Sequence, residues 1–434
     1  MRMTVNEVLK SAPGARLPFG SPNVECTGAV VDSRDVPEGA IFFGIRGETQ
    51  DGSHYAPDAL RGGAAAAVIN EKVWAWLEGE FMAIGKPVIV AADTRDVLQG
   101  AGRVALAKSG ARVVGVTGAT GKTTTKDILV AMLRASGLRA EGTPGNQNTD
   151  IGVPMSLMGI AEDTEVMVVE MGMRGMGQIA ELARLAPPDV GCITSIGPVH
   201  LELLKSVENV AAAKFELLQG LSAGGTAVVP DGDPYLEPLL TTLDDEVRVR
   251  RFGERPTVDL NMNLSTDWQW RCAAAAEACC VALGAPPAPG TTVEVHLSAM
   301  RGNVRPLAAG GVLIEDCYNA NPIAMRAAIQ DLVGRPGRHV AILGDMMELG
   351  GGEADFHREV GELARAQGVD ALIGVGRRAA WYVAGFGDGA VHYADVAEAL
   401  DAVGTLIRDG DTVLVKGSRS MALERITAVL AGDA

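Results

Sequence analysis

The sequence of 434 residues lacks several features that mark particular classes of protein. It has no apolar run of about 18 residues or more, the length that a membrane-spanning helix needs, and its N-terminus lacks the basic-then-apolar pattern of a secretory signal. Basic residues are outnumbered: 38 Lys and Arg stand against 54 Asp and Glu, for a net charge of −16. This charge argues against a protein that coats nucleic acid. We therefore expect a cytoplasmic protein with no membrane span and no nucleic-acid partner.

Cysteine is also sparse, and its spacing matches no metal site. The six cysteines mostly stand in apolar runs, which predicts buried free thiols in a reducing compartment. Apolar residues make up 47% of the chain, enough for a core in each of the two to four domains that its length suggests.

Residues 113–126 combine a short apolar run, a glycine-rich turn and the start of an amphipathic helix. In such a turn, backbone N–H groups and the helix dipole attract phosphate, Lys122 can reach the terminal phosphates, and the Thr123 hydroxyl can hold Mg²⁺. The strict G-x-x-x-x-G-K-[ST] pattern would need glycine where Val116 stands, so the match is to the variant T-G-x-x-G-K-T-T. The arrangement predicts nucleotide binding in preference to an ordinary glycine-rich turn.

Two candidate ligands follow later predicted strands. Glu170 ends the buried strand at residues 166–169, and His200 lies in a glycine–proline loop past the strand at residues 191–194. Because ligand groups gather at the carboxyl ends of strands in α/β sheets, and because hard cations take oxygen, we predict that Glu170 binds Mg²⁺.

A helix is predicted to begin after Ser206 and to stop at Gly220. Lys214 lies in its middle, beside three alanines. From the residues alone we interpret it as a surface or snorkelling lysine.

The alternation of strands and helices predicts an α/β fold of three domains. Residues 1–108 form a small α/β domain, residues 109–298 a central P-loop domain with a parallel sheet, and residues 299–434 a Rossmann-like, doubly wound α/β domain. In the first, Arg34 and Arg46 follow predicted strands and suit an anionic small molecule, although either one alone is typical of solvated surface charge.

The motifs taken together resemble the Mur ligases of peptidoglycan synthesis. The residues that carry the resemblance are the turn at 117–124, Glu170, His200, Lys214 and the Asn319/Asn321 loop. Within the family they are most similar to the MurF subfamily, through residues 170–173, 316–322, 343–350 and 416–421.

The resemblance implies an ATP-dependent amide ligase, expected to be a monomer, that joins D-alanyl-D-alanine to a UDP-linked muramyl peptide through an acyl phosphate. It implies two Mg²⁺ ions, one held by Thr123 and Glu170 and the other by His200 and a carbamylated Lys214. Arg301 would contact phosphate at a domain hinge. The nucleotide would be bound by Gly118, Ala119, Thr120, Gly121, Lys122, Thr123, Thr124, Gln269, Asn319, Asn321 and Asp345. The first domain would bind the UDP end, and substrate contacts would come from Ser33, Arg34, Arg46, Asn146, Asn148, Lys416 and Ser418.

The sequence departs from the family pattern in two places. Gln269 and Cys272 stand where asparagines are expected, the first of which contacts adenine, and Gln147 and Thr149 stand where Tyr and Asn are common. A glutamine can still offer a donor and an acceptor. Two alternatives therefore stay open: a related ligase with a different acid and amine in a specialised pathway, and a non-catalytic nucleotide-binding homologue.

Overall fold

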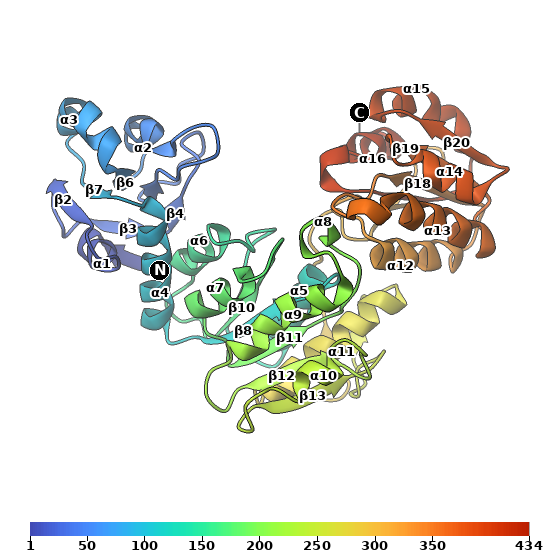
Figure 1. The fold of residues 1–434 in the computed structure, drawn as a ribbon, viewed down its shortest axis with the longest axis horizontal. Helices are drawn as coiled ribbons and strands as arrows, with labels where there is room; N and C mark the ends of the chain where they lie inside the picture. The colour runs from blue at the N-terminus through green and yellow to red at the C-terminus, as the bar shows by residue number, and fades with distance from the viewer. Residues whose placement is uncertain (434) are drawn as a thin grey trace.

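The computed structural model describes residues 1–433. Figure 1 shows three α/β bodies that follow one another along the chain, blue, then green to yellow, then orange to red. The three-domain α/β prediction is confirmed. No helix within the described residues is both long enough and apolar enough to cross a membrane.

The first body is built on a five-stranded sheet in the order β2-β7-β6-β5-β4, parallel except for β2. A two-stranded ribbon of β1 and β3 lies beside it. Its elements are β1 (Arg2–Thr4), α1 (Val5–Lys10), β2 (Arg16–Phe19), β3 (Glu25–Thr27), β4 (Ala29–Val30), β5 (Ile41–Phe43), η1 (Gly52–Tyr55), α2 (Ala56–Arg61), β6 (Ala66–Asn70), α3 (Glu71–Ile84), β7 (Val88–Ala91) and α4 (Thr94–Ser109).

The central body has a six-stranded, wholly parallel sheet in the order β13-β12-β11-β8-β10-β9. Its elements are β8 (Arg112–Thr117), α5 (Lys122–Ala135), β9 (Ala140–Gly142), α6 (Gly152–Gly159), β10 (Val166–Glu170), α7 (Gln178–Leu185), β11 (Val190–Ile193), α8 (Leu201–Leu204), α9 (Val207–Gln219), β12 (Thr226–Pro230), α10 (Glu237–Leu240), β13 (Arg248–Phe252), β14 (Asn261–Met262), α11 (Asp267–Ala282) and β15 (Thr292–Val293).

Strand β8 is the point at which the strand order of the central sheet reverses. The chain passes from β8 to β9 and β10 on one side and to β11, β12 and β13 on the other. In open α/β sheets, ligands bind beyond the carboxyl ends of the strands at such a reversal. The register pairs Glu170 with Val116 and Ile193 with Thr117, so the ends of β8, β10 and β11 meet at one edge.

The last body has a six-stranded sheet in the order β16-β17-β21-β18-β19-β20, parallel except for β16. Its elements are β16 (Asn303–Pro306), β17 (Val312–Asp316), α12 (Pro322–Val333), β18 (His339–Gly344), η2 (Gly350–Gly352), α13 (Glu353–Ala366), β19 (Ala371–Val375), α14 (Ala380–Phe386), β20 (Ala390–Tyr393), α15 (Val396–Leu406), β21 (Thr412–Lys416), η3 (Arg419–Met421) and α16 (Glu424–Ala431).

Local signals place several helix ends. Ser206 caps the start of α9, where its side chain accepts a hydrogen bond from the Asn209 N–H, and Gly220 follows the end of that helix. Helix α12 begins at Pro322. The six cysteines are buried and free, as predicted, and burial raises the pKa of Cys26 to about 12.

Candidate active site

A cavity of about 760 Å³ lies where the three bodies meet. Its walls come from the glycine-rich turn, the loop after β9, the ends of β10 and β17, helices α11 and α12, and Arg95 of α4. Most of the predicted site residues line it: Ala119, Thr120, Gly121, Lys122, Thr123, Thr124, Asn146, Asn148, Glu170, His200, Gln269, Arg301, Asn319, Asn321 and Lys416.

The glycine-rich turn is folded tightly against the end of β11. A Cβ on Gly118 would lie 1.9 Å from Thr194 Oγ1, so no other residue fits there. Gly121, at φ +84°, precedes α5 in a conformation that side chains rarely adopt. Lys122 Nζ lies 2.8 Å from the carbonyl oxygen of Gly118 and so curls back over the turn. The turn presents a helix N-terminus and a lysine to the cavity, as phosphate binding requires.

Glu170 and Thr123 lie together at the edge of the turn. The Thr123 hydroxyl donates to Glu170 Oε2 at 2.8 Å, and Asn148 Nδ2 donates to Oε1 at 2.8 Å. Glu170 is only 1% exposed. The structure thus pairs the two oxygens predicted to share one Mg²⁺, and Asn148 fixes the orientation of the carboxylate.

Lys214 is not a surface lysine, contrary to the interpretation from the residues alone. It is 2% exposed, because the face of α9 that carries it turns into the central body. Burial lowers its pKa well below the ordinary value, and the charge of Lys122 lowers it further. Burial also lowers the pKa of Lys122, while Glu170 raises it in part. The charges of the buried Lys214 and the half-buried Lys122 therefore repel each other.

His200 is oriented by a residue of the third body. Its Nδ1 lies 2.5 Å from Glu348 Oε2, and Arg174 approaches Glu348 Oε1 at 3.4 Å. Burial lowers the pKa of His200, the hydrogen bond to Glu348 raises it, and the charge of Lys214 lowers it. Both His200 and Glu348 have positive φ, 54° and 63°, a conformation that costs energy for residues with a side chain.

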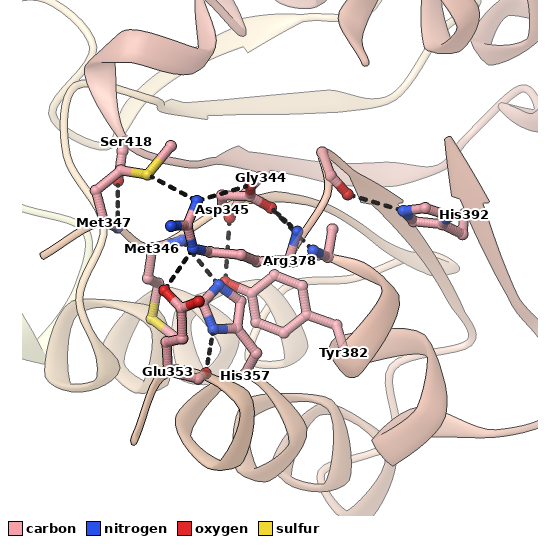
Figure 2. A network of polar contacts seen from close by, with 12 residues as sticks. Gly344, Asp345, Met346, Met347, Glu353, His357, Arg378, Tyr382, His392 and Ser418 are labelled. Atoms are coloured by element: carbon pink, nitrogen blue, oxygen red, sulfur yellow. Dashed lines mark hydrogen bonds and ion pairs between the residues drawn. The ribbon is translucent and has the colours of Figure 1, made fainter. Parts of the chain in front are cut away.

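A polar network in the third body holds residues 345–347, which directly precede Glu348 (Figure 2). Asp345 Oδ1 accepts from the N–H groups of Arg378 and Ala379, both at 2.9 Å. Ser418 Oγ accepts from the Met347 N–H at 3.1 Å, and His357 Nε2 accepts from the Met346 N–H at 3.0 Å. Neither Asp345 nor Ser418 is among the residues that line the cavity. In this arrangement they shape the loop after β18 and do not face the cavity.

The loop after β17 brings two asparagines to the cavity, where they lie beside Lys416, the last residue of β21. Asn321 caps α12 through Oδ1, and its Nδ2 lies 3.4 Å from the carbonyl oxygen of Ala119 in the glycine-rich turn. Lys416 Nζ donates to Asp316 Oδ2 at 2.6 Å and to the carbonyl oxygen of Asn319 at 3.0 Å. The third body therefore touches the nucleotide turn, and Lys416 is held by the end of β17 and the loop that follows it.

Arg301 lines the cavity between the second and third bodies, and its contact with phosphate stays a prediction. Its guanidinium lies 3.8 Å from the centre of the Tyr318 ring, and its charge lowers the pKa of Lys122. This stacked position keeps a cation beside the cavity.

The first-body candidates lie away from this cavity. Arg34 is exposed and pairs with Asp32 at 2.6 Å, which lowers the pKa of Asp32 to about 2. Arg46 is exposed too, and Ser33 is half-buried. None of the three lines the cavity.

Sequence reasoning assigned no role to Glu348, Arg174, Trp268 or Asp331. Arg174, Trp268 and Asp331 line the cavity, and Glu348 contacts His200. Glu348 stands within residues 343–350, and its place after β18 is the signal that could have drawn attention to it. The contact itself depends on how two bodies pack.

Comparisons with known proteins agree with this geometry. The family models described as "Mur ligase family, catalytic domain", "Mur ligase middle domain" and "Mur ligase, glutamate ligase domain" match residues 25–104, 116–272 and 300–419. A UDP-N-acetylmuramoyl-tripeptide--D-alanyl-D-alanine ligase of Bacillus subtilis (strain 168) is 31% identical, with 98% of each chain covered. The chain belongs to the Mur ligase family. It is therefore an ATP-dependent ligase.

Further Mur ligases of the same kind match over nearly the whole chain. The corresponding ligase of Escherichia coli (strain K12) is 31% identical over 92% of each chain. MurF from Acinetobacter baumannii superposes with a TM-score of 0.83 at 25% identity, covering 100% of this chain and 99% of that one. MurF ligase from Thermotoga maritima, solved in complex with ADP, gives 0.78 at 27% identity, covering 94% and 97%.

Proposed function

We propose that this enzyme joins D-alanyl-D-alanine to UDP-N-acetylmuramoyl-tripeptide and converts ATP to ADP and phosphate. The observation that carries the proposal is the single cavity that holds the phosphate-binding turn, the Glu170–Thr123 pair and the third-body loop of Asn319 and Asn321. The names of the relatives supply the two substrates.

The charges of the cavity suit a reaction among anions. The substrate carboxylate would attack the γ-phosphate of ATP and release ADP, leaving an acyl phosphate. Lys122 and Arg301 lie where they would offset the accumulated negative charge. The amine of D-alanyl-D-alanine would then attack the acyl carbon, and phosphate would leave with the oxygen that came from the carboxylate. The third body, closing on the cavity, would exclude water from the acyl phosphate.

The residues beside the turn fit a magnesium ion. Thr123 and Glu170 offer hard oxygen donors that lie 2.8 Å apart. Within residues 1–433 no group of three or more His, Cys, Asp or Glu side chains is placed to hold a metal. Phosphate oxygens of ATP and water would supply the other ligands of the ion. Magnesium bound there would neutralise and polarise the transferring phosphoryl group.

We further propose that Lys214 is carbamylated and serves the second ion with His200. Its pKa is lowered by burial and by Lys122, so a neutral amine is available to add carbon dioxide and release a proton. The carbamate formed is an anion, which turns the repulsion between Lys122 and Lys214 into attraction. It also supplies the oxygen donor that a magnesium site needs.

The UDP end of the substrate would lie on the first body, and the peptide end in the cavity between the central and third bodies. Arg34 and Arg46, exposed on the first body, with the half-buried Ser33, would bind the UDP diphosphate. The peptide end would contact Asn146, Asn148 and Lys416, which line the cavity, and Ser418, two residues after Lys416. Asp345 would contribute to nucleotide binding indirectly, by holding the loop after β18.

The test is ADP release measured over a panel of UDP-muramyl peptides with D-alanyl-D-alanine. Turnover with a tripeptide substrate supports the proposal. Turnover only with another acid or amine assigns the enzyme to a specialised pathway. Bound ATP without turnover across the panel would favour a non-catalytic homologue, against the proposal.

A further inference from the structure

Two hydroxyl side chains in the loop after β11 pack against the glycine-rich turn. Thr194 and Ser195 directly follow Ile193, whose partner in β8 is Thr117. The Thr194 N–H donates to the Thr117 carbonyl oxygen at 2.8 Å, so the pairing of the two strands continues into the turn. The two residues are 4% and 7% exposed, and neither lines the cavity. Any effect that they have on a nucleotide must therefore pass through the turn.

Both hydroxyl groups contact the carbonyl oxygen of Thr120. Thr194 Oγ1 donates to it at 2.6 Å and Ser195 Oγ at 3.0 Å. Thr194 Oγ1 also lies 3.2 Å from the Thr117 carbonyl oxygen, but a hydroxyl has one proton, and the shorter contact takes it. A carbonyl oxygen has two lone pairs, so these two donors satisfy it fully. The Thr120 carbonyl is thereby fixed toward the loop after β11.

A fixed carbonyl also fixes the N–H group of the next residue. The peptide bond between Thr120 and Gly121 is trans, and in a planar trans peptide the C=O and N–H bonds point in opposite directions. Since the carbonyl points to the loop after β11, the Gly121 N–H points away from that loop. Gly121 itself lines the cavity.

The N–H groups of the turn fall into an occupied set and an available set. The Ala119 N–H donates to the Ser195 carbonyl oxygen at 2.9 Å, and the Thr120 N–H donates to Ser195 Oγ at 3.0 Å. Within residues 1–433 nothing accepts from the N–H groups of Gly121 and residues 122–124. Helix α5 orients the last three of these donors, whereas the direction of the first depends on the peptide before it.

We propose that Thr194 and Ser195 are positioning residues for phosphate binding: by holding the Thr120 carbonyl, they aim the Gly121 N–H at the phosphates of ATP. The proposal rests on the proposed function for the identity of the anion. A donor already aimed at an anion makes a charge-assisted hydrogen bond without first being reoriented. If neither hydroxyl held the peptide, it could rotate and turn the partial negative charge of the carbonyl oxygen toward the phosphates.

Because the two hydroxyl groups share one task, their removal should have non-additive effects. Thr194→Val removes one donor at nearly constant volume, and Ser195→Ala removes the other. Each single variant leaves one hydroxyl on the Thr120 carbonyl and should weaken binding about threefold. The double variant should weaken it about a hundredfold, roughly tenfold beyond the product of the single effects.

The experiment is calorimetric titration of the full chain with magnesium and either ATP or inorganic tripolyphosphate, which carries phosphates but no base. Both ligands should lose affinity by the same factor, because the affected contact is to phosphate. Neither the acid nor the amine is present, so a failure to ligate the proposed substrates would leave this measurement standing. The Thr194→Ser/Ser195→Ala variant keeps one hydroxyl and should bind as Ser195→Ala alone does.

Thr164→Val is the matched control, because the buried Thr164 hydroxyl contacts Glu141 outside the cavity lining. It should lower the melting temperature and leave both affinities unchanged. A loss of affinity in the double variant no larger than the product of the single losses would overturn the proposal. Equal binding by Thr194→Val and Thr194→Ser would overturn it as well, and this second comparison decides the matter if the double variant does not fold.

Discussion

The first and third bodies meet the central one with different balances of apolar and polar contacts. The first is joined mainly by packed apolar side chains, together with an ion pair from Arg95 to Asp150 and a hydrogen bond from Gln99 to Glu181. The third is joined by hydrogen bonds, ion pairs and a few apolar contacts. Both junctions can be seen in Figure 1. Helix α4 of the first body lies against α6 of the central body, and α8 of the central body lies at the edge of the third body.

Helix α6 of the central body enters the core of the first. Met158 is buried in the same cluster as Leu98 and Ala101 of α4. The two helices approach so closely at Gly102 that an added Cβ would stand 2.8 Å from Pro154 Cβ. Interiors packed at this density do not deform smoothly, so we infer that the first and central bodies move as one.

The third body is attached mainly through polar groups. Asn321 reaches Ala119, Arg335 reaches Ser265, and Glu348 reaches both His200 and Arg174. Ile323 packs partly buried against the central core. Polar contacts can be exchanged for water at small net cost, so this junction is the one suited to opening and closing. The comparison assigns phosphate binding to the fixed pair of bodies and assembly of the full site to the third.

The largest expected effect on turnover comes from the phosphate-binding residues of the central body. Lys122→Ala and Glu170→Ala should each lower turnover about a thousandfold or more, because a preorganised charge at the phosphates is lost. The melting temperature should stay near that of the wild type. Steady-state ADP release and differential scanning calorimetry check both, with the exposed Lys72→Ala as a control. Near-normal turnover in either site variant would remove the phosphate and metal assignments.

The polar junction between the central and third bodies should show the next largest effect on turnover. Glu348→Ala should lower kcat by about 10- to 100-fold, since residues that orient a metal ligand have effects of that size. It should also increase the radius of gyration measured by X-ray scattering with nucleotide bound. The neighbouring Glu202→Ala keeps its backbone contact to Glu348 and serves as the control. Equal kcat and equal scattering in Glu348→Ala would show that the contact holds neither His200 nor the third body.

The close packing of α4 against α6 predicts that two glycine-to-alanine substitutions change the free energy of unfolding in opposite directions. Gly102→Ala should destabilise the protein by about 1–3 kcal/mol, because the new methyl group meets Pro154 backbone and ring atoms. Gly79→Ala, in helix α3 with open space around it, should stabilise it by about 0.5–1 kcal/mol. Denaturant unfolding measures both. Two shifts of the same sign would contradict the close approach of α4 and α6.

The smallest expected effect is a pH dependence within the third body. His357 Nδ1 donates to the carbonyl oxygen of Glu353 and Nε2 accepts from the Met346 N–H, so the neutral ring is required. Burial lowers the pKa of His357. The unfolded chain therefore binds more protons below about pH 6.5, and this stability, complete above that pH, is lost as the pH falls toward the folded pKa.

The His357→Gln variant keeps a donor and an acceptor but does not titrate. Its unfolding free energy should fall less than that of the wild type between pH 7 and pH 5, a difference of at most about 1.4 kcal/mol per pH unit. Parallel curves for the two proteins would show that His357 does not titrate on unfolding.

Features set by neighbours in sequence were predictable, and features set by the packing of bodies were not. The turn at residues 117–124 and Glu170 at the end of β10 follow from local pattern and sheet topology. The burial of Lys214 depends on which face of α9 meets the core, which three flanking alanines do not reveal. The contact of Glu348 with His200 and the place of Asp331 in the cavity lining depend on the position of the third body, which no local pattern encodes.

The central claim is that the γ-phosphate passes to a substrate carboxylate in the cavity beside Lys122. The most direct measurement uses UDP-muramyl tripeptide with ¹⁸O in the reacting carboxylate, together with ATP and D-alanyl-D-alanine. An acyl phosphate predicts one ¹⁸O atom in each phosphate released with the product. Product formation with unlabelled phosphate would contradict it.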